Sequence, residues 1–186
     1  WYDFKEVVEK SSKNLFTNIN EATEALEKEL VDVVQMQSLS DVPLGAFLSG
    51  GVDSSTIVAL MQKQNSQPIK TFTIGFEDPE FNEAPYAADV ANHLQTDHSE
   101  LFVTGEDAQS LVSDLPKIYD EPFADYSQIP TFFVCKSAKQ AVTVSLSGDA
   151  GDELFGGYNR YLLAPKLWKK LNKLPKLVRK FLGRTL

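Results

Sequence analysis

Short apolar runs alternate with longer helical patterns along most of this chain of 186 residues. The apolar runs predict strands at 42–48, 70–76, 100–103 and 142–146. The patterns between them predict helices at 20–38, 53–64, 83–94, 106–118 and 129–140. Strands that alternate with helices in this way are typical of an α/β fold with a mostly parallel sheet covered on both faces. We therefore expect a doubly wound sheet followed by C-terminal helices.

Three of the expected strands end in unusual sequences. Residues 49–55 read SGGVDSS, residues 75–78 read GFED, and residues 147–149 read SGD. Open α/β sheets bind ligands beyond the carboxyl ends of their strands, where the strand order reverses. Because the carboxyl ends of parallel strands meet at one edge, the three sequences together predict one active site there.

The SGGVDSS sequence has the composition of an anion-binding loop. Paired glycines let the backbone turn sharply and come close to a ligand, and the N–H groups at the start of the following helix attract negative charge. Ser49, Ser54 and Ser55 add hydroxyl donors, and Asp53 offers a hard oxygen ligand for Mg²⁺. The loop matches neither the Walker pattern nor GxGxxG. It predicts a polyphosphate site of another kind.

Acidic residues predict two further features. Asp149, Asp152 and Glu153 are spaced so that a helix would bring all three carboxylates to one face, and a cation or a helix N-terminus must then offset their repulsion. We favour metal binding by at least one of them. The 120–125 segment, DEPFAD, is open to two interpretations: it holds the ammonium group of an amino-acid substrate, or it is an ordinary acidic loop.

The remaining reactive side chains carry weaker signals. Cys135 follows three apolar residues and is predicted to lie in the core, while His93 and His98 are predicted on a helix face and a strand edge rather than as metal ligands. A single cysteine excludes an internal disulfide and fits a reducing cytoplasm. The sequence has no secretory signal and no run of about 18 apolar residues that could span a membrane.

Charge is distributed unevenly along the chain. Residues 166–186 hold eight of the 18 Lys and Arg residues and no acid, which leaves ten basic residues against 26 acids in 1–165. Leucines at 167, 171 and 174, followed by Val178, Phe181 and Leu182, form an apolar stripe between these basic residues. The pattern favours an amphipathic helix, broken at Pro175, that packs on a partner, and it argues against a nucleic-acid ligand.

Ordered motifs identify the family that the chain resembles. SGGVDSS resembles the signature loop of the ATP pyrophosphatases, whose sheets have the adenine nucleotide alpha hydrolase-like fold. Five further motifs narrow the resemblance to the glutamine-hydrolysing asparagine synthetases: 41–45 (DVPLG), 73–78 (TIGFED), 120–125 (DEPFAD), 129–131 (IPT) and 146–158 (LSGDAGDELFGGY). The matching segment runs from about Asn20 to Tyr161.

The resemblance implies a role for each matching residue. Ser49, Gly50, Gly51, Ser54 and Ser55 would hold the phosphates of ATP, and Phe47 and Ile74 would frame the adenosine through their backbones. Asp53 and Asp152 would share Mg²⁺. Ser147 and Gly148 would lie near the α-phosphate, and Asp149 would be the catalytic acid that assists adenylate formation and ammonia attack. Asparagine synthetases usually carry glutamate at this position, so Asp149 puts the substrate in question.

The resemblance implies an ATP-dependent ligase that adenylates the aspartate side chain for amidation by ammonia from a glutaminase domain. That domain is not part of this sequence, nor is the family's lysine in a later helical segment. We therefore expect a fragment: a linker remnant at 1–19, a synthetase core at 20–165, and a truncated basic helical segment at 166–186. A different carboxylate substrate, as in β-lactam synthetases, an inactive ATP-binding module and a homo-oligomer all stay open.

Overall fold

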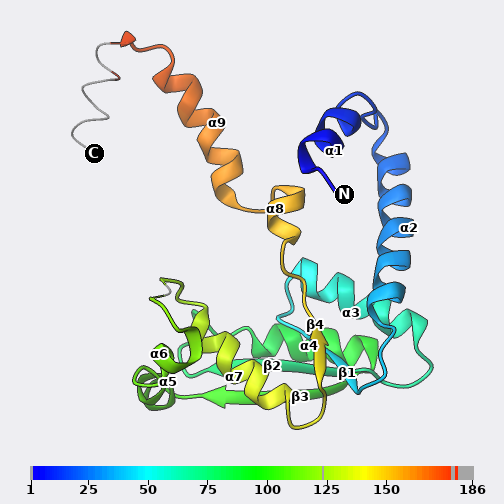
Figure 1. The fold of residues 1–186 in the computed structure, drawn as a ribbon, viewed down its shortest axis with the longest axis vertical. Coiled ribbons are helices and arrows are strands. Elements are labelled where there is room, and N and C mark those ends of the chain that lie inside the picture. Colours follow the sequence, from blue (N-terminus) through cyan, green and yellow to red (C-terminus); the bar gives the residue numbers. More distant parts are fainter. Residues whose placement is uncertain (1, 123, 177–178, 180–186) are drawn as a thin grey trace. The chain divides into compact units, whose positions relative to one another are not determined.

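The computed structural model describes residues 2–122, 124–176 and 179. Its sheet has four strands, β1 (Leu44–Phe47), β2 (Lys70–Phe76), β3 (Asp97–Val103) and β4 (Val144–Leu146). They lie in the order β3-β2-β1-β4, and every neighbouring pair is parallel (Figure 1). The predicted parallel α/β sheet is confirmed.

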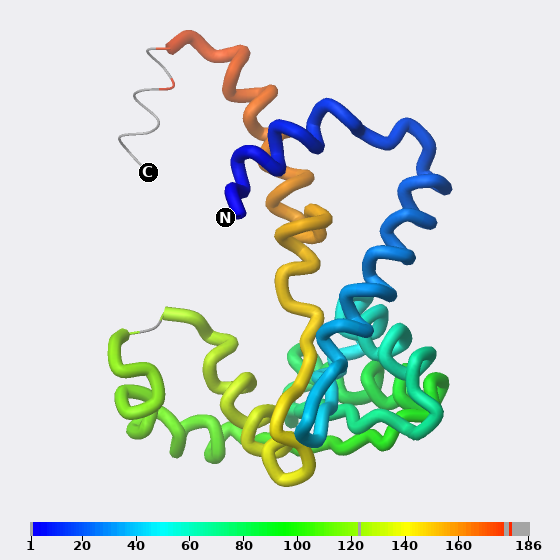
Figure 2. Tube along the Cα trace, turned by 45° about the vertical axis from the view of Figure 1, so that its right-hand side comes forward, coloured from blue at the N-terminus to red at the C-terminus, as the bar shows by residue number. Residues whose placement is uncertain are grey.

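Helices connect the strands and cover both faces of the sheet. The N-terminal helices are α1 (Phe4–Ser11) and α2 (Ile19–Gln37), and the connecting ones are α3 (Val52–Gln64), α4 (Ala84–Leu94), α5 (Gly105–Leu111), α6 (Leu115–Tyr119) and α7 (Gln128–Ala138). The α3 helix packs on β1, α4 packs on β2 and β3, and the two helices contact each other. Figure 2 traces the chain through them. The α7 helix also packs on β2 and β3, but its Ala138 belongs to a different core cluster from that of α3 and α4. The sheet is therefore doubly wound, as predicted.

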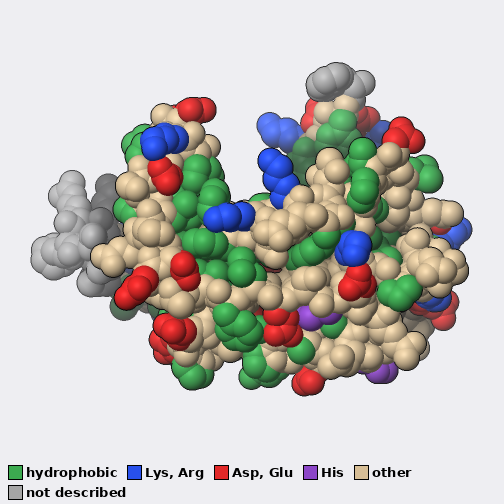
Figure 3. Space-filling model, turned by 90° about the horizontal axis from the view of Figure 1, so that it is seen from below, with side chains coloured by type: hydrophobic (Ala, Val, Ile, Leu, Met, Phe, Trp, Pro, Cys, Tyr) green, Lys and Arg blue, Asp and Glu red, His purple; other side chains and the backbone are tan. Residues whose placement is uncertain are grey.

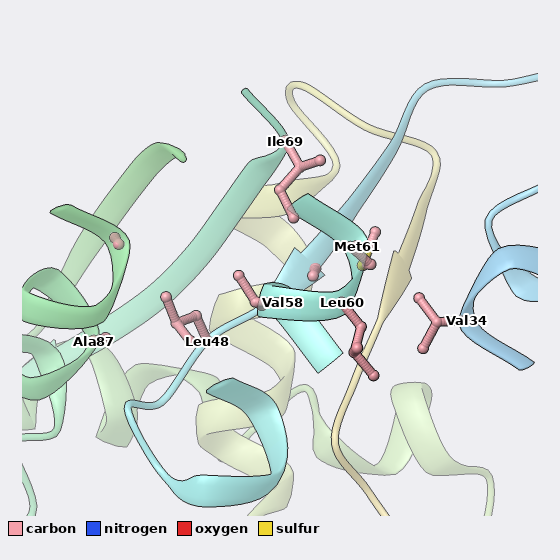
Figure 4. Packing of buried hydrophobic residues seen from close by; sticks show 9 residues of the cluster. Val34, Leu48, Val58, Leu60, Met61, Ile69 and Ala87 are labelled. Atoms are coloured by element: carbon pink, nitrogen blue, oxygen red, sulfur yellow. The ribbon is translucent and has the colours of Figure 1, made fainter. Parts of the chain in front are cut away.

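The side chains of the strands alternate between the two faces, because successive residues of a strand point in opposite directions. Ala46 and Leu48 join the core under α3 and α4, together with Val58 and Met61 of α3 (Figure 4). Phe72 of β2 instead packs with Ala138 of α7 and with Val142. Burial on both faces explains why these strands read as continuous apolar runs.

One helix prediction is wrong. The helix predicted at 106–118 is two short helices, because Pro116 has no amide hydrogen for an interior helix position and instead lies in the first turn of α6. Within the segment predicted to be a linker remnant, residues 4–11 form α1, which Asp3 caps by accepting a bond of 2.9 Å from the Lys5 amide. The α2 helix is capped by Asn18.

Cys135 also departs from its prediction. The structure places it on an exposed position of α7, while Phe133 and Ala138 of the same helix are buried. The apolar sequence before Cys135 misled the prediction, because the helix turns by about 100° per residue and carries successive residues to different faces.

The chain divides into two compact units, of which the first ends at Ser147 and the second begins at Gly148. The second unit contains α8 (Gly151–Phe155) and α9 (Asn159–Leu171). None of its described residues is buried, and Leu167 and Trp168 of α9 are each 58 % exposed. Leu167 and Leu171 of the predicted apolar stripe lie on α9, whereas Leu174 follows the helix end, so the helix ends before the break predicted at Pro175. The predicted continuation of the stripe at Val178, Phe181 and Leu182 lies outside the described residues.

No helix within the described part of the chain is both long and apolar enough to cross a membrane. On the face that Figure 3 draws, acidic side chains lie interspersed with apolar ones.

Candidate active site at the carboxyl edge of the sheet

The order in which the chain adds strands to the sheet reverses between β1 and β4. From β1 the chain crosses to β2 and then to β3 on one side, and it returns to place β4 on the other side of β1. Ala46 pairs with Leu146, so Phe47 and Ser147 follow at the same level on neighbouring strands. The SGGVDSS loop and the start of the 147–149 segment therefore leave the sheet together at the point where ligands bind in this class of fold.

Serine hydroxyls hold the SGGVDSS loop in shape. The Ser49 amide donates to Ser54 Oγ at 3.2 Å, the Gly51 amide donates to Ser49 Oγ at 3.3 Å, and the two hydroxyl oxygens lie 3.0 Å apart. Two of the loop's amides thus have partners inside the loop. The amides of Val52, Asp53 and Ser54 precede the first intrahelical bond of α3, from the Ser55 amide to the Gly51 carbonyl. Amides in this position attract anions.

The two glycines of the loop have different roles. Gly50 has a φ of +78°, and a Cβ there would lie 2.6 Å from the backbone carbon of Tyr86 in α4. At Gly51 the φ is −70°, and an added Cβ would meet only Ser49 Oγ, at 3.3 Å. Gly50 is therefore required by the fold, while Gly51 leaves space next to the helix start.

Two other predicted ligand residues belong to the first turn of α3. Asp53 is half-buried there, where the positive end of the helix dipole favours a carboxylate. Ser55 Oγ is buried and has no hydrogen-bond partner among the described residues. A buried hydroxyl without a partner is a group that a bound ligand can satisfy.

Phe47 and Ile74, predicted to contact adenosine through their backbones, have side chains in the core. Phe47 packs with Phe72, and Ile74 packs in the cluster that contains Val103 and Phe133. Ile74 lies two residues beyond the last β1–β2 pair, Phe47 with Phe72, so its backbone has no partner residue in β1.

The predicted residues that follow β4 divide between the two units. Ser147 ends the first unit, whereas Gly148, Asp149 and Asp152 belong to the second. The prediction that Asp149 shares a helical face with Asp152 and Glu153 is wrong, because α8 begins only at Gly151, after Ala150 with a φ of 72°. The α8 helix ends at Gly156, its C-cap, which has a φ of 71°.

Local contacts hold the acids of α8. The Tyr158 hydroxyl donates to the Glu153 carboxylate at 2.7 Å, which lowers the pKa of Glu153. The Arg160 guanidinium stacks 4.1 Å from the Tyr158 ring centre. The Asp152 carboxylate lies so close to Gly157 that a Cβ there would overlap it. Glu153 is therefore already engaged within its own segment.

The 120–125 segment lies between α6 and α7. Asp120 has a φ of 54°, and the Asp125 carboxylate accepts a bond of 2.8 Å from the Ser127 amide, which lowers the pKa of Asp125. These contacts are compatible with both interpretations of the loop.

The described residues contain no group of three or more His, Cys, Asp or Glu side chains that could hold a metal by themselves. Mg²⁺ usually binds through one or two carboxylates together with substrate phosphates. Asp53, beside the amides that precede the first intrahelical bond of α3, fits such a phosphate-assisted site.

Asn82 and Tyr86 were not predicted, although both support this edge of the sheet. The Asn82 side chain accepts bonds from the amides of Phe76 and Ala84, and Tyr86 lies against Gly50. An asparagine just before a helix is a recognised capping signal. Nothing in the sequence reveals the contact of Tyr86 with a distant glycine.

The strand order and the loop at its switch point define a domain of the adenine nucleotide alpha hydrolase-like fold. The structure of NMN synthetase from Francisella tularensis shares this fold, with a TM-score of 0.52 and 14 % identity over 74 % of this chain and 59 % of that one. A model of the asparagine synthase family matches residues 25–186. The chain belongs to the asparagine synthase family.

Curated relatives agree with this assignment. A putative glutamine-hydrolyzing asparagine synthetase 2 of Methanocaldococcus jannaschii is 40 % identical over 179 residues, which cover 96 % of this chain and 32 % of the relative. Asparagine synthetase 1 of Bacillus subtilis, also named as glutamine-hydrolyzing, is 38 % identical over 96 % of this chain and 28 % of its own length. The chain therefore spans about a third of the length of these relatives.

Proposed function

We propose that the chain is the ATP-dependent synthetase core of an asparagine synthetase, which activates the side-chain carboxylate of aspartate. One observation carries the proposal: in a member of the asparagine synthase family, SGGVDSS lies at the switch point of the sheet, and the amides of Val52, Asp53 and Ser54 precede the first intrahelical bond of α3. Free amides at a helix start bind phosphate.

The loop residues bind and orient ATP in this proposal. The amides of α3 and the hydroxyls of Ser54 and Ser55 hold the β- and γ-phosphates, and the backbones of Phe47 and Ile74 contact the adenosine. Asp53, together with Asp152, would hold Mg²⁺, which neutralises charge on the pyrophosphate. Ser147 and Gly148 lie next to the α-phosphate. The Ser49 hydroxyl keeps the loop in its binding shape through its bond with Ser54.

The reaction has two balanced steps. An oxygen of the aspartate side chain attacks the α-phosphorus of ATP and forms an acyl adenylate, and pyrophosphate leaves with the bonding electron pair. Ammonia then attacks the acyl carbon, AMP leaves, and Asp149 accepts the proton that the nitrogen loses. The ammonia comes from glutamine, the substrate that the relatives' names give.

Asp149 supports a second candidate substrate. Because its side chain is one methylene shorter than the glutamate usual in asparagine synthetases, the same chemistry would suit a carboxylate other than that of aspartate. The class of reaction, ATP-dependent amide formation, is unchanged. We also propose that the protein acts in the cytoplasm, which its single cysteine fits.

The test uses the full-length protein with ATP, Mg²⁺, glutamine and aspartate. We expect AMP, pyrophosphate and asparagine in equal amounts. Formation of ADP would contradict the proposal, and formation of AMP only with another carboxylic acid would favour the second candidate. If ATP binds without turnover with every acid, the chain is a binding module instead.

A further inference from the structure

Asn82 joins the end of β2 to the start of α4. Its Oδ1 accepts hydrogen bonds from two backbone amides, those of Phe76 at 3.4 Å and Ala84 at 3.2 Å. Phe76 is the last residue of β2, and Ala84 is the first residue of α4. One side-chain oxygen therefore sets the distance between a strand end at the candidate site and the helix that follows.

Each of these amides lies where regular structure ends. The Phe76 amide belongs to the part of β2 that runs beyond its last pair with β1. The Ala84 amide lies in the first turn of α4, where no intrahelical acceptor exists, and the N-cap residue Glu83 makes no side-chain capping bond. Asn82 thus serves as the cap that Glu83 does not provide.

The start of α4 in turn sets the position of the SGGVDSS loop. A Cβ at Gly50 would lie 2.6 Å from the Tyr86 backbone carbon and 2.8 Å from the Ala87 amide nitrogen, so the loop lies directly against the helix backbone. Ala84 and Ala87 are 1 % and 0 % exposed. Because both sides of this contact are tightly packed, a shift of the α4 start displaces Gly50 as well.

We propose that Asn82 is a positioning residue for the phosphate-binding loop, acting on Gly50 through the first turns of α4. The inference rests on the proposed function, since the ligand of the loop is taken to be ATP. Asn82 itself touches neither ATP nor the reacting atoms. Its effect is to hold the α3 amides where phosphate oxygens bind.

The test compares four variants of the full-length protein. Asn82→Ala removes the acceptor, and Asn82→Gln keeps the amide but moves its oxygen by one methylene. Asn82→Asp keeps an acceptor at the same distance from the backbone. Asn92→Ala, which changes an asparagine at an exposed position of α4, is the matched control.

Steady-state kinetics gives the first readout. We expect Asn82→Ala and Asn82→Gln, which disturb both hydrogen bonds of the Asn82 oxygen, to raise the KM for ATP about five- to tenfold. The kcat stays within about twofold, because the catalytic groups are unchanged. Asn82→Asp restores the KM, and Asn92→Ala leaves it unchanged. If Asn82 only stabilised the protein as a helix cap, its variants would have a lower melting temperature, but the KM for ATP would not rise at constant kcat.

Hydrogen exchange of the ligand-free protein gives a second, independent readout. In Asn82→Ala and Asn82→Gln, amides of residues 49–55 should exchange about tenfold faster, while Asn92→Ala matches the parent. Folded variants with unchanged KM and unchanged exchange would overturn the proposal, as would a KM effect that Asn82→Asp fails to restore. If the parent protein does not bind ATP, the proposed function fails, yet the exchange of residues 49–55 still decides whether Asn82 positions the loop.

Discussion

Two loops of this chain begin with the same two residues and are held in different ways. Ser49-Gly50 follows β1, and Ser147-Gly148 follows β4, and acids and small residues come after both. The first loop leads into α3, a helix of 13 residues with buried Val58 and Met61. The second leads into α8, a helix of 5 residues with none buried.

The difference shows what tertiary packing adds to a motif. Gly50 lies against the α4 backbone, and serine hydroxyls bond across the first loop. In the segment after the second loop, the Tyr158 hydroxyl donates a hydrogen bond to the Glu153 carboxylate. We therefore expect changes in the first loop to affect stability and binding together, and changes in the second to separate stability from catalysis.

The largest effect is expected at Asp149. Replacing it with asparagine removes the proton acceptor of the proposed reaction, so kcat should fall about 10²- to 10⁴-fold. The melting temperature should change by no more than about 2 °C, because Asp149 is exposed. AMP release by the full-length protein measures the effect, with Asp89→Asn on α4 as the control. A variant with the parent kcat would exclude Asp149 as the base.

Gly50→Ala should be the most damaging change in the first loop. An alanine there combines a φ of +78° with a contact of 2.6 Å to the α4 backbone, and we expect a loss of about 2–4 kcal/mol in the free energy of unfolding. Weaker ATP binding should accompany it.

Gly51→Ala is the matched control, since its φ is ordinary and its nearest contact is Ser49 Oγ. It should cost less than about 1 kcal/mol. Urea denaturation measures both variants. Equal losses in the free energy of unfolding would show that the close contact of Gly50 with α4 does not matter for stability.

His98 should make stability depend on pH in the sheet behind the first loop. Burial lowers the pKa of His98, although Glu100 opposes this, and its Nδ1 lies 2.8 Å from Thr71 Oγ1. The unfolded chain therefore binds more protons below about pH 6.5, so stability falls as the pH drops through that value and levels off below the folded pKa.

His98→Gln should remove this slope, while exposed His93→Gln should keep it. Melting temperatures between pH 8 and pH 5 provide the measurement. The pKa of Glu153 is lowered by its hydrogen bond from Tyr158, so this carboxyl does not contribute in this window. If the melting temperature of His98→Gln still falls with pH, another titratable group causes the pH dependence.

The smallest effect is expected at Ala150, which has a φ of 72° just before α8. Glycine relieves this conformation, so Ala150→Gly should stabilise the second loop by about 0.5–1 kcal/mol. Ala141→Gly, at an exposed position with an ordinary φ, should instead destabilise slightly. Loss of stability in both variants would show that the positive φ of Ala150 carries no strain.

Much of the fold could be predicted because its signals are local. Apolar runs marked β1 and β2, and the glycine pair marked the turn into α3. The prediction of one helix at 106–118 was wrong because the helical periodicity of the surrounding residues was given more weight than Pro116. Cys135 failed because an apolar neighbourhood in the sequence does not determine which side of a helix faces the core.

The site could be predicted only as a set of loops. The sequence placed SGGVDSS and the 147–149 segment after strands, and parallel topology brought the strand ends together. It did not reveal that Ser49 and Ser54 bond to each other or that Asp149 lies outside α8. Hydrogen-bond partners depend on backbone geometry that the residue types alone leave open.

By itself, the sequence determined the alternation of strands and helices, the family, and the residues at the sheet edge, because periodicity, turn residues and motifs are properties of neighbouring positions. Only the tertiary structure decided that Gly50 is required by packing, that Asn82 ties β2 to α4, and that His98 is held by Thr71. These roles arise from contacts between segments far apart in the chain, and close packing makes such contacts specific to one folded arrangement.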